Sequence, residues 1–261
     1  RSENMAYNQF IEAANSMADA SGAVIRAGDQ KSFQIVKKGD GSPVTSVDQA
    51  TEDRVRDIIS EAFPDHGIVG EERDDHAPDS EFVWVLDPID GTLPFLAGIP
   101  VYGTLIALLH QKRPVLGVID MPMTGDRWIG CEGMPTTRNG EPCRTRSCAD
   151  LSDAMMSTSN PDYYDESNVS ALEQMRDRSN WNVYGGSCMA YAQIASGRID
   201  VGMDVLFDVH DYMALVPVIQ GAGGIISDWS GKALDLNSGD RFVAAGDARV
   251  HEQALEILSA I

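Results

Sequence analysis

The first apolar pattern along the chain has the period of an amphipathic helix. Across residues 4–27, apolar side chains recur at steps of three and four positions, and Gly28 follows as a helix stop. A second helix is predicted to begin at Ser46, where Ser46 and Gln49 resemble a capping box, and to end before Pro64. Both helices are expected to bury their apolar faces in a core.

The centre of the chain alternates short apolar runs with polar turns. Residues 82–86 form a continuous apolar run of strand length that ends abruptly at Asp87. Further runs of strand length occupy residues 102–109, 115–119 and 128–131. Asn139-Gly140 is typical of a tight hairpin turn, so we predict an antiparallel sheet in this stretch.

Beyond about Arg144 the pattern changes to strands that alternate with helices. The predicted strands cover residues 155–158, 181–184, 199–204, 225–228 and 242–245. The predicted helices cover residues 169–176, 187–196, 211–220 and a closing segment from 248. Pro217 lies inside one of these helices and predicts a kink. The alternation favours an α/β architecture with some parallel pairing, and we expect residues 1–143 and 144–261 to form two halves of one continuous body.

Composition narrows the class of protein. The chain has 261 residues, of which 43% are hydrophobic, and its 40 acidic residues against 20 basic ones give a formal charge of -20. Such a charge disfavours nucleic acid as a partner. The sequence has no apolar run of membrane-spanning length and no secretory leader, so we expect a cytoplasmic protein without a membrane partner. The four cysteines show no CxxC pairing, and we expect buried or idle thiols.

The segment DPIDGT, residues 87–92, carries the most informative chemistry. Asp87 and Asp90 follow a buried strand, and two carboxylates this close favour a bound cation such as Mg²⁺, with the carbonyl of Ile89 as a further oxygen ligand. Gly91 permits close backbone approach and Thr92 offers a hydroxyl, which suits a phosphate or a water beside the metal. Taken alone, the segment could also be an ordinary aspartate-rich turn.

Each of the acidic residues elsewhere in the motifs has both a structural and a chemical interpretation. Glu71 and Glu72 follow an apolar segment and could be a solvated loop or a source of ligands. Asp48 in the first turn of its helix could serve as a cap, and Asp211 could be the N-cap of the next-to-last helix. The glycines at 221–224 follow a helix and are interpreted as a helix stop rather than a nucleotide loop.

Five blocks in this order resemble the inositol monophosphatase family of lithium-sensitive, magnesium-dependent phosphomonoesterases. The blocks are DGSPVTSVD (40–48), GEE (70–72), WVLDPIDGT (84–92), DYMA (211–214) and GAGG (221–224). The resemblance spans nearly the whole chain and implies a layered αβαβα sandwich of the inositol monophosphatase and fructose bisphosphatase type. It also implies a small phosphate ester as substrate, and family members are commonly homodimers.

The resemblance further assigns roles to residues that match the motifs. Two or three Mg²⁺ would be held by Glu71, Asp87, the Ile89 carbonyl, Asp90 and Asp211. Thr92, with Asp48 or Glu71, would orient and deprotonate the attacking water, while the backbone N–H groups of Gly91 and Thr92 would hold the phosphate. Ser187 and Cys188 could be proposed as nucleophiles, but no histidine is near in sequence, so packing and substrate contact are preferred for them.

Within the family, residues 104–120 and 211–219 look like the histidinol-phosphate phosphatases, which makes histidinol phosphate the leading substrate and histidine biosynthesis the implied pathway. The sequence departs from that subgroup in three ways: Ser187 replaces an aspartate, Asp204 replaces a glutamate, and Leu93-Pro94 replaces a polar pair. His210 stands where the family prefers an aromatic residue and could contact substrate. The alternatives are a phosphatase for inositol phosphate or another polyol or sugar phosphate, and a non-catalytic member that binds metal or phosphate.

Overall fold

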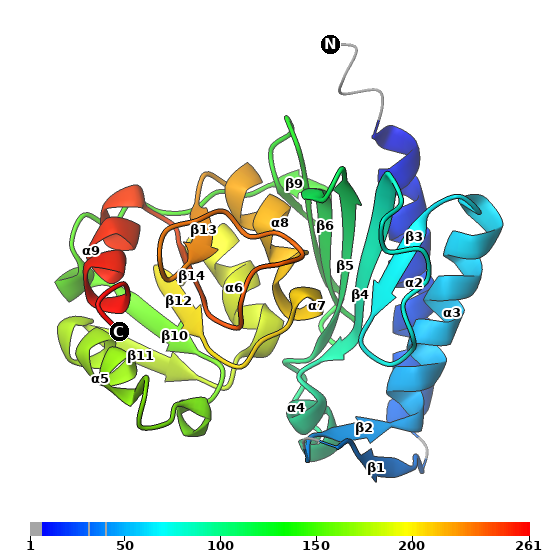
Figure 1. Cartoon of the computed structure of the whole chain (residues 1–261), viewed down its shortest axis with the longest axis horizontal. Coiled ribbons are helices and arrows are strands. Elements are labelled where there is room, and N and C mark those ends of the chain that lie inside the picture. The colour runs from blue at the N-terminus through cyan, green and yellow to red at the C-terminus, as the bar shows by residue number, and fades with distance from the viewer. Residues whose placement is uncertain (1–6, 31, 40) are drawn as a thin grey trace.

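Helical and sheet layers alternate through the molecule in a five-layer αβαβα sandwich (Figure 1). The computed structural model describes residues 7–30, 32–39 and 41–261. The helices of the three helical layers are α2 (Asn8–Asp29) with α3 (Ser46–Ala62), α6 (Ser187–Ala195) with α8 (Leu215–Gly221), and α5 (Val169–Arg178) with α9 (Ala248–Leu258). The layered sandwich predicted from the sequence is confirmed.

The first sheet has seven strands in chain order, covered on one face by α2 and α3. Its strands are β3 (Gly67–Gly70), β4 (Phe82–Asp90), β5 (Gly103–His110), β6 (Arg113–Met121), β7 (Asp126–Cys131), β8 (Thr137–Arg138) and β9 (Glu141–Pro142). Only the β3–β4 pair is parallel among these described strands. Asn139 and Gly140 have φ angles of 52° and 84° and form the predicted hairpin turn between β8 and β9.

The second sheet has five strands in the order β11-β10-β12-β14-β13. Its strands are β10 (Met155–Thr158), β11 (Trp181–Tyr184), β12 (Val201–Asp204), β13 (Ile225–Asp228) and β14 (Phe242–Ala245). β10 pairs in parallel with β11 and β12, and β14 pairs in antiparallel with β12 and β13, so the predicted partial parallel pairing is confirmed.

Smaller elements connect these layers. They are the hairpin of β1 (Ile35–Lys37) and β2 (Pro43–Thr45), the helices α4 (Thr92–Ala97) and α7 (Val209–Tyr212), and the 3₁₀ turns η1 (Leu151–Asp153) and η2 (Pro161–Tyr163). None of the helices in the described ranges is long and apolar enough to cross a bilayer. The four cysteines form no disulfide, and Cys131, Cys148 and Cys188 are buried, as the sequence suggested.

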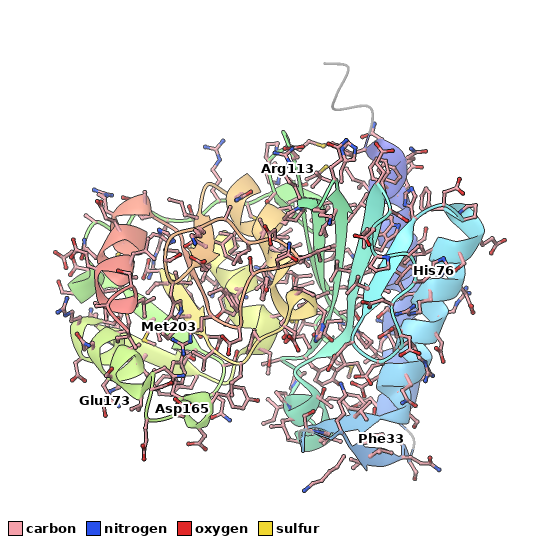
Figure 2. The ribbon with its side chains drawn as sticks, viewed as in Figure 1. Phe33, His76, Arg113, Asp165, Glu173 and Met203 are labelled. Atoms are coloured by element: carbon pink, nitrogen blue, oxygen red, sulfur yellow. The ribbon has the colours of Figure 1, made fainter. Side chains whose placement is uncertain are left out.

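Apolar side chains fill the space between adjacent layers (Figure 2). Helix α8 packs directly onto the seven-stranded sheet at two glycines that have no side chain in the way. A Cβ atom on Gly117 would lie only 2.1 Å from the backbone oxygen of Ala214. A Cβ atom on Gly130 would lie 2.3 Å from the backbone oxygen of Pro217. The two glycines therefore bring α8 against β6 and β7, which fixes the chain just after Asp211 relative to this sheet.

The start of α3 differs from the sequence prediction. The N-cap is Thr45, whose hydroxyl accepts hydrogen bonds from the backbone N–H groups of Val47 and Asp48, over 3.1 and 3.3 Å. Asp48 completes the capping box by accepting from the Thr45 N–H over 2.9 Å. Ser46 and Gln49 are therefore not the capping pair: α3 begins at Ser46 as predicted, but its N-cap is the preceding residue, Thr45.

Two further helices differ from the predicted bounds. The helix predicted over residues 211–220 is divided into α7 and α8, with the interruption at Met213 and Ala214. Pro217 lacks the N–H that would bond to the carbonyl of Met213 four residues earlier, so the helical hydrogen bonds are interrupted at that point, although Met213 and Ala214 keep right-handed helical backbone angles. The first helix continues past Gly28 to Asp29, and its predicted beginning at residues 4–6 lies outside the described residues, as does Asp40.

Candidate active site

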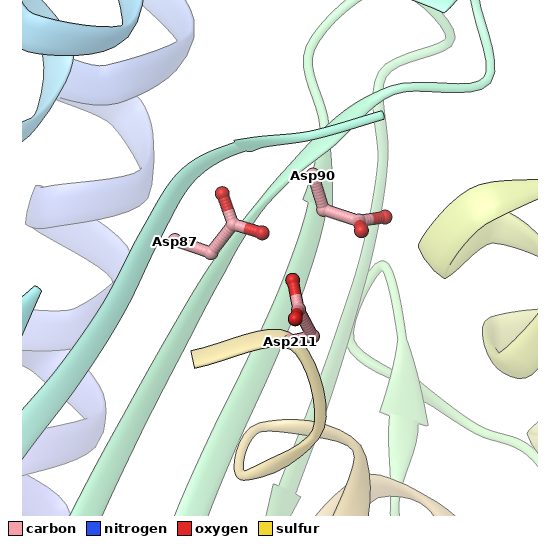
Figure 3. A group of neighbouring side chains, drawn as sticks. All are labelled: Asp87, Asp90 and Asp211. Carbon is pink, nitrogen blue, oxygen red and sulfur yellow. The ribbon is translucent and has the colours of Figure 1, made fainter. Parts of the chain in front are cut away.

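Three aspartates from two distant segments converge beside the end of β4. Asp87 and Asp90 lie on β4, where the pairing with β5 shifts register between them, and Asp211 lies on α7. Each offers a carboxylate oxygen, and these oxygens all lie within 4.8 Å of one another (Figure 3). The sequence interpretation that joined DPIDGT with Asp211 therefore describes residues that are neighbours in space.

The aspartates repel one another in a largely buried environment. Burial, with the charge of Asp211, raises the pKa of Asp90 to about 7. Burial also raises the pKa of Asp211 to about 8, and burial followed by the charge of Glu71 raises that of Asp87 well above its ordinary value. Oδ1 of Asp87 is buried without a hydrogen-bond partner among the described residues. Carboxylate oxygens in this arrangement fit a hard divalent cation. A bound cation would offset the repulsion between the carboxylates and would give the buried Oδ1 of Asp87 a partner.

Glu71 directly follows β3, and its backbone N–H donates to the carbonyl of Leu86 on β4 over 3.2 Å. Its carboxylate is not part of the three-aspartate group but lies close enough to act on the pKa of Asp87. Nζ of Lys38 lies 2.6 Å from Oε1 of Glu71 and 2.7 Å from Oε1 of Glu72. Sequence reasoning missed Lys38, because a lysine in a glycine-rich turn has no local signal for a partner 33 residues away.

Burial raises the pKa of Glu72 to about 7, although the hydrogen bond from Lys38 works in the opposite direction. For Lys38, burial alone would lower the pKa, but the two glutamates outweigh it and raise the pKa. Lys38 therefore supplies a positive charge at the edge of the acidic cluster.

Thr92 stands at the start of α4 between two oxygen acceptors. Its hydroxyl lies 3.3 Å from the carbonyl oxygen of Ile89 and 3.5 Å from Oδ1 of Asp48. The other oxygen of Asp48 is held by the N–H and hydroxyl of Thr45, and burial raises the pKa of Asp48. The structure thus brings Asp48, Ile89 and Thr92 together, as the sequence interpretation requires.

Gly91 and the start of α6 meet on the other side of the cluster. Gly91 has a φ of 90°, and a Cβ atom there would lie 2.7 Å from Oγ of Ser187. The backbone N–H of Cys188 donates to Oδ2 of Asp90 over 2.5 Å. The thiol of Cys188 is buried, and burial together with Asp90 raises its pKa well above the ordinary value, which disfavours a thiolate nucleophile.

Asp204 and His210 differ in their access to the cluster. Asp204 is fully buried, and its oxygens accept hydrogen bonds from the Thr158 hydroxyl, the N–H and hydroxyl of Ser159, and the Tyr191 hydroxyl, over 2.5–2.9 Å. The structure therefore does not present an open oxygen of Asp204 to a ligand. Nε2 of His210 lies 4.0 Å from Oδ2 of Asp211, and 16% of its side chain is exposed.

The fold and this cluster of carboxylates define the class of protein: a phosphatase of the metal-dependent, five-layer sandwich type. A model of the inositol monophosphatase family matches residues 6–261, and the chain belongs to that family.

The chain is 45% identical over 260 residues to the chloroplastic bifunctional phosphatase IMPL2 of Arabidopsis thaliana, covering 96% of this chain and 75% of that protein. It is 33% identical over 220 residues to a histidinol-phosphatase of Chlorobaculum parvum, covering 84% and 85%. The solved structure of an inositol monophosphatase from Zymomonas mobilis superposes with a TM-score of 0.89 at 38% identity, covering 97% of this chain and 99% of that one.

Proposed function

We propose that the chain is a Mg²⁺-dependent phosphomonoesterase whose metal ligands are Glu71, Asp87, the Ile89 carbonyl, Asp90 and Asp211. The observation that carries this proposal is the buried Oδ1 of Asp87, which has no hydrogen-bond partner in the described part of the chain and lies within a group of three converging carboxylates. Without a cation such a group would repel the two negative charges that a phosphomonoester carries near neutral pH.

When bound, two or three Mg²⁺ would lower the pKa of a water molecule and withdraw charge from the phosphoryl oxygens. The hydroxyl of Thr92 is placed to orient that water. Oδ1 of Asp48 faces Thr92 and can receive a proton, since Oδ2 is already occupied by Thr45, and Glu71 is the alternative acceptor. The backbone N–H groups of Gly91 and Thr92 would hold the phosphate, because the first N–H groups of a helix have no partner within it.

Histidinol phosphate is the substrate we propose. The resemblance of residues 104–120 and 211–219 to histidinol-phosphate phosphatases supports it, as does the 33% identity to a histidinol-phosphatase. Ser187 and His210 border the cluster and are the candidate contacts for the organic part of the substrate. Asp204 would act on specificity indirectly, by holding Tyr191 and Ser159 in place.

The second candidate substrate class is inositol 1-phosphate or another polyol or sugar phosphate. The match to the Zymomonas inositol monophosphatase favours it, because identity and coverage are both high. A non-catalytic role as a metal or phosphate binder is disfavoured by the presence of every proposed catalytic residue. A homodimer, sensitivity to lithium and a cytoplasmic location stay predictions; the Arabidopsis relative is a chloroplastic protein.

A phosphate-release panel tests the function and the substrate together. The panel contains histidinol phosphate, inositol 1-phosphate, fructose bisphosphate and adenosine bisphosphate, each with Mg²⁺ and with a chelator. We expect Mg²⁺-dependent release that Asp90→Asn removes, with the highest kcat/KM for histidinol phosphate. An equal or higher kcat/KM for another phosphate ester of the panel would overturn the assignment of histidinol phosphate as the substrate. The absence of phosphate release from every ester of the panel would overturn the proposal that the chain is a phosphatase.

A further inference from the structure

An ion pair on α3, formed by the buried Glu52 and the partly exposed Arg56, lies behind the Glu71–Glu72 turn and outside the proposed site. Only 1% of Glu52 is exposed, and its Oε1 accepts a hydrogen bond from Nε of Arg56, one turn later on the helix, over 2.7 Å. A buried charge is costly unless its oxygens are fully partnered. The other oxygen of Glu52 therefore needs a donor from outside the pair.

That donor is the backbone of the turn itself. Oε2 of Glu52 accepts the N–H of Glu72 over 2.7 Å, and Nη2 of Arg56 donates to the carbonyl of Arg73 over 3.2 Å. The N–H of Glu71 is meanwhile bonded to Leu86 on β4. The backbone of Glu71 is thus bonded to β4, that of Glu72 to Glu52, and that of Arg73 to Arg56. These three bonds fix the position of the Glu71 Cα atom and the direction of its side chain.

The preceding residue shows how closely the turn fits around this pair. A Cβ atom on Gly70 would lie 2.2 Å from Oε1 of Glu52 and 2.7 Å from Nη2 of Arg56. Only glycine leaves room for the ion pair to reach the backbone. The segment GEE therefore combines a glycine that admits Glu52, a glutamate directed toward the aspartate cluster, and a glutamate whose N–H is the anchor.

We propose that Glu52, supported by Arg56, is a positioning residue for metal binding: it acts through the backbone of Glu72 and sets the place of the Glu71 carboxylate. The inference rests on the proposed function, in which Glu71 is a metal ligand. Residues that orient metal ligands from behind commonly change metal affinity when they are replaced.

The test measures Mg²⁺ affinity by calorimetry without substrate, for the wild type, Glu52→Ala, Glu52→Gln and Glu71→Gln. Glu61→Ala is the matched control, because Glu61 is an exposed glutamate on the same helix. We expect Glu52→Ala to weaken Mg²⁺ binding by about 10- to 100-fold. Glu52→Gln should recover much of the affinity, since its amide oxygen can still accept the Glu72 N–H, and Glu61→Ala should match the wild type.

A second readout separates positioning from general destabilisation. The Mg²⁺ concentration for half-maximal phosphate release should rise in Glu52→Ala, while kcat at saturating Mg²⁺ stays close to that of the wild type. If Glu52→Ala fails to fold, Glu52→Asp takes its place, because the shorter carboxylate keeps its charge but withdraws from the Glu72 N–H.

The outcomes distinguish two failures. If Glu71→Gln weakens Mg²⁺ binding but Glu52→Ala binds like the wild type, the positioning role is overturned and the proposed function stands. If Glu71→Gln also binds like the wild type, Glu71 is not a ligand, and both the positioning role and the proposed ligand set are overturned.

Discussion

The backbone N–H of Cys188 donates to Oδ2 of Asp90 over 2.5 Å, joining residues 98 positions apart in the sequence. The bond connects the first turn of α6 with the end of β4 and thus ties the central helical layer to the acidic cluster. Because Asp90 is also one of the three converging aspartates, this bond restricts the direction in which its carboxylate points. Cys188 serves the site through its main chain, and its thiol lies 3.6 Å from the sulfur of Met121.

Cys188→Ala is expected to retain phosphate release, since alanine keeps the N–H that bonds to Asp90. A nucleophilic cysteine would lose nearly all activity on this change, whereas we expect kcat/KM within roughly tenfold of the wild type. The measurement is Mg²⁺-dependent phosphate release, with iodoacetamide treatment of the wild type as a parallel check. Inactivation by the reagent together with an inactive Cys188→Ala would show that the thiol takes part in the reaction.

A comparison of Gly91→Ala with Gly98→Ala separates the effect of backbone strain from the effect of the close contact between Gly91 and Ser187. Both glycines flank α4 with positive φ angles, 90° and 70°, but a Cβ atom on Gly98 would meet no atom within 4 Å. Gly98→Ala should lower the free energy of unfolding by about 1–2 kcal/mol through backbone strain alone. Gly91→Ala adds the clash with Ser187, which should cost a further 1–3 kcal/mol, roughly, and should also reduce phosphate release.

Urea unfolding and kcat/KM measured on both variants test this difference. Equal losses of stability, with activity unchanged in Gly91→Ala, would mean that Ser187 moves aside and that the close approach at Gly91 has no role.

Thr92→Ser and Thr92→Val test the hydroxyl between Ile89 and Asp48. Serine keeps the donor, whereas valine keeps the shape and removes it. We expect Thr92→Val to lower kcat by about 10²- to 10⁴-fold, the usual range for a group that assists proton transfer, and Thr92→Ser to stay near the wild type. Steady-state phosphate release measures both. A Thr92→Val variant with wild-type kcat would exclude the hydroxyl from the reaction.

The acidic cluster predicts how pH changes the stability of the metal-free protein. The pKa values of Asp90 and Asp211 are raised to about 7 and about 8 in the folded state, so the folded protein binds more protons than the unfolded chain above about pH 4. These groups therefore make the metal-free protein lose stability as pH rises from about 4 to about 8. Mg²⁺ opposes this loss and, at 100 times its Kd, should add about 2.7 kcal/mol.

Thermal unfolding with chelator and with excess Mg²⁺ at pH 5 and pH 8 checks the prediction. The increase in Tm on adding Mg²⁺ should be larger at pH 8, where the carboxylates are ionised, and Asp90→Asn should reduce it. An increase that is the same at both pH values would show that the cluster is not the site of binding.

Elements whose pattern is local were predicted well. The apolar run at 82–86 forms the first part of β4, and Asn139-Gly140 forms the turn between β8 and β9, because strand patterns and turn conformation depend on neighbouring residues. The error at the start of α3 concerns two adjacent candidates for the N-cap, since Thr45 rather than Ser46 caps the helix. The kink predicted from Pro217 corresponds to the interruption between α7 and α8 at Met213 and Ala214.

The sequence by itself determined which residues could supply the chemistry: carboxylates at the ends of apolar segments, a glycine and a threonine after DPID, and an aspartate at the start of a helix. Tertiary structure decided which of them meet. The approach of Asp211 to within 4.8 Å of Asp87 and Asp90, the contact of Lys38 with Glu71, and the four hydrogen bonds that occupy Asp204 all join segments far apart in the sequence. Local periodicity sets the elements, but only the packing of the layers sets distances between side chains so far apart along the chain.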